Sequence, residues 1–342
     1  MRERLGKWWP VLKILLGLVI LYFVGKSLWH DLSEPDLWQR SYNITWLILA
    51  GALYLLGLGC TMLYWGLLLR RAGQFPGVIG LFRGYYIGLL GKYVPGKAWA
   101  LLLRAAFVDK RKVNAAVAVQ TGFYEVMMMM AGAGVAACIL FLLIGVPEAD
   151  SGLWKHKFDL VRLSLPGDVD LDYRGLALIA LILATPFLAI SFPLLFNRVA
   201  ARLTRAVERF AGEPLTRIEA SSYLRGFPME MACWFCMGAS LYFTLHAANP
   251  NGVEWDWKLW GYLTAAVALA CVAGFVIIIL PSGLGVREYF LIAILRPLDL
   301  GPSIALAVIV LRIVWTFAEL IMAGGLYLLR PPHETPKATG SS

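Results

Sequence analysis

Long apolar runs separated by short polar segments dominate the pattern of this sequence. Seven of these runs reach the length of about 20 residues that an α-helix needs to span a bilayer. Since a helix satisfies its backbone polar groups internally, the pattern predicts an all-α polytopic membrane protein. The seven runs cover residues 9–29, 44–69, 113–146, 175–197, 228–248, 259–280 and 303–329.

Two segments, 79–108 and 259–296, are apolar but broken by glycine, proline and charged residues. The first has Pro95-Gly96 at its centre, and the break in the second begins at Pro281. Irregular backbone is tolerated at membrane depth only where it is buried in protein or lines a cavity. We therefore expect two broken or re-entrant helical segments in addition to six to seven full transmembrane helices.

The second broken segment leaves two topologies open. If residues 259–280 cross the membrane fully, there are seven spans and the C-terminus lies outside. If 259–296 is instead a re-entrant pair entered from outside, six spans remain and the two breaks meet from opposite sides. The inverted repeats of transporters, and the proline, glycine and basic residues that both breaks share, favour the second topology.

Basic residues give the chain an orientation. One set of alternate hydrophilic segments carries 14 Lys and Arg and the other carries six, so the positive-inside rule places the richer set in the cytoplasm. The richer set includes the N-terminus and both flanks of 79–108, which should therefore enter and leave the membrane on the same side. The richer segments are 1–8, 70–78, 109–112 and 198–227, and the poorer ones are 30–43, 147–174 and 249–258.

Composition narrows the function classes. Hydrophobic residues make up 59% of the chain and charged residues 15%, against about 25% charged in soluble domains, which excludes an ordinary soluble enzyme. The net charge of +9 is first a topology signal, and nucleic acid is not an expected partner. We expect residues 1–330 to form one integral domain of the cell (inner) membrane. Residues 331–342 should be a disordered polar tail, and both termini should be cytoplasmic.

Catalytic and metal-binding motifs are lacking in the sequence. There is no GxSxG elbow, P-loop, HExxH or acidic metal cluster, so we expect neither an enzyme nor a cofactor or metal site. All five cysteines lie in apolar stretches, which argues against an extracellular disulfide framework.

The first break has the features of an anion site. Pro95 favours the first turn of a half-helix, whose free N–H groups and dipole attract anions. Lys92 and Lys97 add positive charge beside this turn, and Gly96 lets the backbone approach a ligand.

The second break repeats this arrangement. Gly283 and Gly285 allow close approach, and Arg287, followed by Glu288, lies in the first turn of the next half-helix. Broken helices whose N-termini face an anionic group at mid-membrane hold substrates in several transporters. For a bilayer protein the obvious anion is a lipid phosphate, which the basic residues of both breaks should neutralise.

Charged residues also lie deep inside the predicted helices. Glu125 is about 18 Å into its helix. Arg312 and Glu319 share a face but are too far apart to pair, so Glu125 is a candidate partner for Arg312. The three form either a proton-coupling or gating network or structural ion pairs that fix helix register. Glu230, near the expected cytoplasmic end of its helix, should snorkel to the surface.

At the two breaks the sequence resembles a known family. Residues 91–99, followed by Arg104, resemble the first signature of the lysylphosphatidylglycerol synthase transmembrane (flippase-like) family, and residues 281–288 resemble the second. The resemblance spans about residues 10–330. It implies a protein that moves or handles anionic or lipid-linked substrates, and it adds Trp99 and Arg104 to the expected lipid-binding residues. Nothing resembles the family's attached synthase domain, so aminoacyl transfer is not implied.

The function expected from these features is that of a flippase-like translocase for an anionic phospholipid or a lipid-linked phosphate. The alternative is a non-transporting membrane partner of a lipid-linked glycosyltransferase or another lipid-modifying enzyme. The expected partners are therefore phosphate-bearing membrane lipids and, in the alternative, such an enzyme. The sequence does not indicate an oligomeric state.

Overall fold

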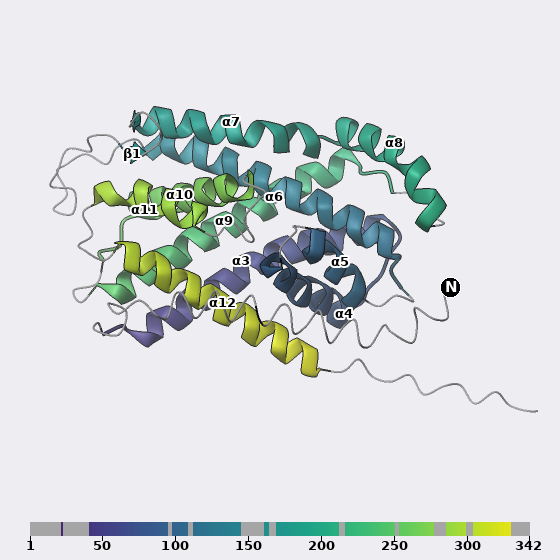
Figure 1. The fold of residues 1–342 in the computed structure, drawn as a ribbon, viewed down its shortest axis with the longest axis horizontal. Helices are drawn as coiled ribbons and strands as arrows, with labels where there is room; N and C mark the ends of the chain where they lie inside the picture. Colours follow the sequence, from purple (N-terminus) through teal and green to yellow (C-terminus); the bar gives the residue numbers. More distant parts are fainter. Residues whose placement is uncertain are drawn as a thin grey trace, which may run out of the picture.

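Long apolar helices that lie side by side along the longest axis of the molecule form its body (Figure 1). Within the described residues, six of them are long and apolar enough to cross a membrane. This arrangement confirms the expected all-α polytopic membrane fold. The six are α3 (Ile44–Arg71), α6 (Ala115–Ile144), α7 (Tyr173–Ser191), α9 (Ala220–Ala248), α10 (Trp257–Val276) and α12 (Ile304–Leu328).

The computed structural model describes most of the chain from residue 41 to residue 329. The described residues are 22, 41–94, 98–108, 112–144, 161–163, 169–211, 216–249, 253–276, 285–298 and 304–329, with backbone alone at 161–163, 169–171, 203–211 and 297. Several sequence predictions lie outside the described residues. These are the helix at 9–29 except for Tyr22, the residues Pro95, Gly96, Lys97, Pro281 and Gly283, and the tail at 331–342.

Two expected helix boundaries are wrong, and both errors involve proline. The run at 175–197 is two helices, because Phe192 is extended (ψ 124°) and Pro193 begins α8 (Pro193–Ala211). Helix α9 begins at Ala220, eight residues before the expected start at Pro228. A helix can continue on the N-terminal side of a proline, because the ring removes only one backbone hydrogen bond. Much of the expected loop at 198–227 is therefore helical.

Within the described residues, parts of the basic segments and parts of the less basic segments lie at opposite ends of the helices. At one end Arg71 donates to Glu219 (3.2 Å), which joins two of the basic segments. At the other end the Asn43 N–H donates to the carbonyl of Ala247 (3.2 Å), beside two of the less basic segments. The antiparallel strands β1 (Val161–Leu163) and β2 (Val169–Leu171) also lie at this second end (Figure 1).

The chain reverses direction within the broken segment 79–108. Two glycines keep its arms in contact. A Cβ added at Gly91 would lie 2.6 Å from the carbonyl carbon of Trp99, and one at Gly88 would lie 3.0 Å from the Cα of Arg104. The first arm comprises α4 (Val78–Phe82), the π-helical turn η1 (Arg83–Ile87) and the 3₁₀ turn η2 (Leu90–Tyr93), and the second arm is α5 (Ala98–Phe107).

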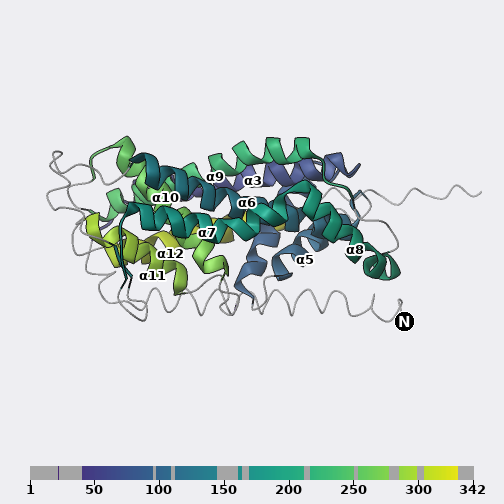
Figure 2. The same ribbon diagram turned by 90° about the horizontal axis from the view of Figure 1, so that it is seen from above.

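Helix α11 (Val286–Leu295), followed by the 3₁₀ turn η4 (Arg296–Leu298), packs antiparallel to α10 and forms a second hairpin. In the second turn of α10, the Tyr262 hydroxyl donates to the carbonyl of Ile294 in the last turn of α11 (2.8 Å). The N-terminal end of α10 and the C-terminal end of α11 therefore lie at the same level. Gly285 caps the N-terminus of α11 with φ +83°, a left-handed conformation that favours glycine. The two hairpins lie toward opposite ends of the molecule (Figures 1 and 2).

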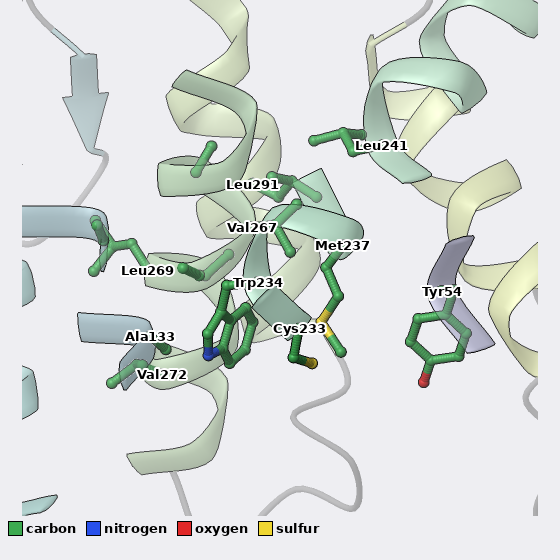
Figure 3. Packing of buried hydrophobic residues seen from close by; sticks show 14 of the residues in the cluster. Tyr54, Ala133, Cys233, Trp234, Met237, Leu241, Val267, Leu269, Val272 and Leu291 are labelled. Carbon is green, nitrogen blue, oxygen red and sulfur yellow. The ribbon is translucent and has the colours of Figure 1, made fainter. Parts of the chain in front are cut away.

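A buried apolar core holds the second hairpin against the long helices. Trp234 of α9, Val267 of α10 and Leu291 of α11 belong to one cluster, together with residues of α3 and α6 (Figure 3). The Trp234 indole donates to the carbonyl of Met129 in α6 (3.0 Å). This core fixes the position of α11, and with it the charged residues at the start of α11, relative to α3, α6 and α9.

Candidate functional site

Glu319 in the middle of α12 receives hydrogen bonds from the first hairpin and from α3. Its side chain is fully buried and forms an ion pair with Lys92 of η2. The Tyr93 hydroxyl, also in η2, donates to Glu319 Oε2 (3.0 Å), and the Tyr54 hydroxyl of α3 donates to Glu319 Oε1. A carboxylate buried at this depth is stable only with such partners. This set of bonds ties the tip of the first hairpin to α12.

Helix α12 also meets the start of α11 in the second hairpin. Arg287 forms an ion pair with the adjacent Glu288 (2.8 Å), and Arg312 of α12 lies 4.0 Å from the same carboxylate. The Arg287 guanidinium stands over the ring of Trp315, 5.3 Å from its centroid, a cation–π contact. Glu288 also accepts the N–H of Gly285 (2.8 Å) and so fixes the first turn of α11.

An aromatic pair joins the two groups of charges. Tyr54 and Trp315 stack with their planes 8° apart. Lys92 lies within 3.4 Å of the Tyr54 hydroxyl, whereas Arg287 contacts Trp315. Trp315 and Glu319 are one helical turn apart, about 6 Å along the axis. Lys92 and Arg287, which flank the centres of the two breaks, therefore meet on one face of α12, and we call this cluster of seven side chains the α12 site. Its members are Tyr54, Lys92, Arg287, Glu288, Arg312, Trp315 and Glu319.

The α12 site carries an excess of positive charge. Three cations, Lys92, Arg287 and Arg312, face two carboxylates, so the named groups sum to +1 at neutral pH. The side chains of Lys92 and Arg287 remain 26% and 19% exposed, whereas that of Glu319 is fully buried. Lys92 and Arg287 are thus more accessible than either carboxylate, since Glu288 is 14% exposed, and the site can accept a monoanion without a change in protonation.

The remaining candidate residues lie elsewhere or only support the site. Gly285 caps α11 beside it, and Trp99 in α5 is 37% exposed. Arg104 and Glu125, by contrast, form an ion pair with each other inside the protein. The expectation that Glu125 partners Arg312 is therefore wrong. Glu125 lies on α6 and faces α5, whereas Arg312 faces the start of α11.

The Arg104–Glu125 pair has its own neighbours. The Arg104 side chain is 3% exposed and its guanidinium lies 4.2 Å from the centroid of the Tyr85 ring. The Tyr85 hydroxyl donates to Glu125 (3.3 Å) and bonds with Thr61 of α3. This pair joins α5, η1, α6 and α3, and it occupies the Arg104 guanidinium, which the resemblance placed among the lipid-binding residues.

Sequence reasoning missed the buried position of Glu230 and the aromatic members of the α12 site. Glu230 is fully buried and does not snorkel, because α9 begins ten residues before it. Tyr54 and Trp315 carry no charge and gave no signal of their own. The spacing of Arg312, Trp315 and Glu319 at i, i+3 and i+7 places them on one helix face and could have identified Trp315.

The family model described as the lysylphosphatidylglycerol synthase TM region matches residues 11–324 of the chain. A search among curated proteins gives no match. In the part of the chain that the structure describes, no group of three or more His, Cys, Asp or Glu could hold a metal ion.

Proposed function

Because the chain belongs to the lysylphosphatidylglycerol synthase TM region family, we propose that this multi-pass membrane protein binds a phosphate-bearing lipid headgroup at the α12 site and moves the lipid across the bilayer. The main observation in support of this proposal is that Lys92 and Arg287 both contact α12. They come from hairpins at opposite ends of the molecule and meet α12 one turn apart.

The charge of the α12 site suits a phosphodiester. Such a group carries one negative charge, which matches the +1 sum of the named side chains. An arginine guanidinium offers a planar fork of donors to phosphate oxygens, and lysine adds a compact charge. An arriving phosphate would compete with Glu319 for Lys92 and with Glu288 for Arg287, so binding would loosen both hairpins from α12.

The helix arrangement supports access from both sides of a membrane. We propose that the hairpin 79–108 enters from the cytoplasmic side and that the α10–α11 hairpin enters from outside, with both termini in the cytoplasm. Opposed hairpins that meet at mid-depth give alternating access to one site in transporters built from broken helices. The acyl chains would stay in the hydrocarbon layer while the headgroup passes between the hairpins.

Lipid movement can be measured in proteoliposomes. The purified protein is reconstituted with fluorescent phosphatidylglycerol in both leaflets, and an impermeant reductant is added outside. Wild type should expose the inner-leaflet label, whereas the double variant Lys92→Ala/Arg287→Ala should leave it protected. Arg174→Ala removes an exposed cation outside the α12 site and should behave like wild type.

Two other results would count against the proposal. Equal movement of labelled glucosylceramide, which has no phosphate, would show that the α12 site does not select a phosphate. Binding of phosphatidylglycerol without movement would contradict transport and would favour a non-transporting partner of a lipid-modifying enzyme.

A further inference from the structure

Glu230 is a buried carboxyl group without a hydrogen-bond partner. It lies about 15 Å along α9 from the start of the helix, and the residue is fully buried. Neither of its two carboxyl oxygens has a hydrogen-bond partner among the described residues. Gly132 of α6 lies opposite, since a Cβ added there would come within 3.3 Å of the Glu230 Cβ. An isolated carboxylate in such a place would bear a large desolvation penalty.

Titratable groups from five elements interact electrostatically with Glu230. Among these neighbours only Arg104 and Glu125 are charged at neutral pH; the thiols and phenols are neutral. The neighbours are Cys60 and Tyr64 from α3, Tyr85 from η1, Arg104 from α5, Glu125 from α6 and Cys233 from α9 itself.

The charges around Glu230 do not balance unless one proton is bound. Two carboxyl groups, Glu125 and Glu230, face one guanidinium, so the cluster carries −1 when both acids are ionised. One added proton makes it neutral, which a buried site favours. Arg104 is already committed to Glu125 by the ion pair. Glu230 is therefore the acid on which the proton resides.

Arg104 also offers an unused donor for the deprotonated state. Its Nε is buried and makes no hydrogen bond within the described structure, although the charges of Arg104 and Glu230 interact. An unpaired buried donor and an unpaired buried acid in one cluster are both costly, and proton loss would make the acid a charged and stronger acceptor for that donor.

We infer that Glu230 is a reversible proton-binding site inside the membrane domain. On release, the O–H bond of the acid breaks, the proton passes to water, and the Glu230 carboxylate accepts the Nε–H of Arg104, which keeps its contact with Glu125. The site lies apart from the α12 site and does not depend on lipid movement. Proton binding at Glu230 makes the packing of α5, α6 and α9 depend on pH.

Infrared spectroscopy of the purified protein tests the inference directly. Wild type should show the C=O stretching band of a protonated carboxylic acid at neutral pH, and alkaline titration should remove it. Glu230→Gln should abolish the band, whereas Glu219→Gln, a change at an exposed acid bordering the same helix, should retain it. Absence of the band in wild type, or its persistence in Glu230→Gln, overturns the inference.

Thermal stability gives an independent measurement. The protonated native state holds a proton that the unfolded chain releases, so wild-type stability should fall as the pH rises above neutrality. Glu230→Gln imitates the neutral acid, so it must fold, and its stability should lack this decline. Failure of Glu230→Gln to fold while Glu219→Gln folds would overturn the inference. Stabilisation of wild type by sodium over choline, lost in Glu230→Gln, would identify a metal-cation site instead.

Discussion

The rings of Tyr54 and Trp315 stack with their centroids 4.3 Å apart, and each of the two residues contacts a cation from a different hairpin. Lys92 lies beside the Tyr54 hydroxyl and Arg287 stands over Trp315. The Trp315 indole is held in turn by Ser240 of α9 (2.9 Å). A displacement of either cation therefore changes the packing of the same aromatic pair, which links the two hairpins mechanically.

Replacement of Arg287 should weaken the binding of anionic lipid. Arg287→Ala removes one charge-assisted contact, so we expect an affinity for phosphatidylglycerol about tenfold lower, or about 1.4 kcal/mol. Arg287→Lys keeps the charge but loses the planar fork and should give an intermediate affinity. Lipid-dependent thermal stabilisation in detergent measures this, with Arg174→Ala as control. Equal affinities in all four proteins would exclude Arg287 from the lipid site.

Replacement of Glu319 should affect stability and binding in opposite directions. Glu319→Gln removes the counter-charge of Lys92 and weakens the bonds from Tyr54 and Tyr93. Because Lys92 is partly exposed, the loss of stability should be about 2 kcal/mol, less than for a fully buried pair. The released Lys92 should bind anionic lipid more tightly. Thermal unfolding with and without phosphatidylglycerol separates the two effects, and a parallel loss of both would contradict competition between lipid and Glu319.

Replacement of Arg104 or Glu125 should chiefly lower the free energy of unfolding. Arg104→Ala leaves a carboxylate without its cation inside the protein, and we expect a loss of about 3 kcal/mol or more. The apolar double variant Arg104→Met/Glu125→Leu should recover part of it. Glu219→Gln, at the exposed Arg71–Glu219 pair, should cost about 1 kcal/mol or less. A milder effect of Arg104→Ala than of Glu219→Gln would show that the buried pair does not hold α5 against α6.

The long helices could be predicted because each is uniformly apolar over a bilayer's thickness, and this signal needs no knowledge of neighbours. The pairing of charged side chains could not be predicted in this way. Lys92 and Glu319 are 227 positions apart, and Arg104, which was expected to bind lipid, is paired with Glu125. Residue spacing within one helix says nothing about which other helix lies opposite. Glu230 was misplaced because Pro228 reads as a helix start, although the helix continues through it.

The N-terminal end of α10 lies beside the C-terminal end of α11, and this arrangement predicts a specific membrane topology. The hydrogen bond from Tyr262 to Ile294 holds the two outer ends together, so cysteines at Glu254 and Arg296 should lie on the same side of the membrane. An impermeant maleimide should modify Glu254→Cys and Arg296→Cys in intact cells. Phe75→Cys, exposed at the basic end before the first hairpin, should react only after permeabilisation.

A different labelling pattern would exclude the proposed mechanism. If Arg296→Cys needed permeabilisation while Glu254→Cys did not, the α10–α11 segment would cross the membrane fully. Residues 254 and 296 would then lie on opposite faces, and Arg287 would no longer approach Lys92 from the opposite side. The match between the +1 charge of the α12 site and a phosphodiester would remain, but access to it from both faces would not. Binding without transport would then be the function that the site supports.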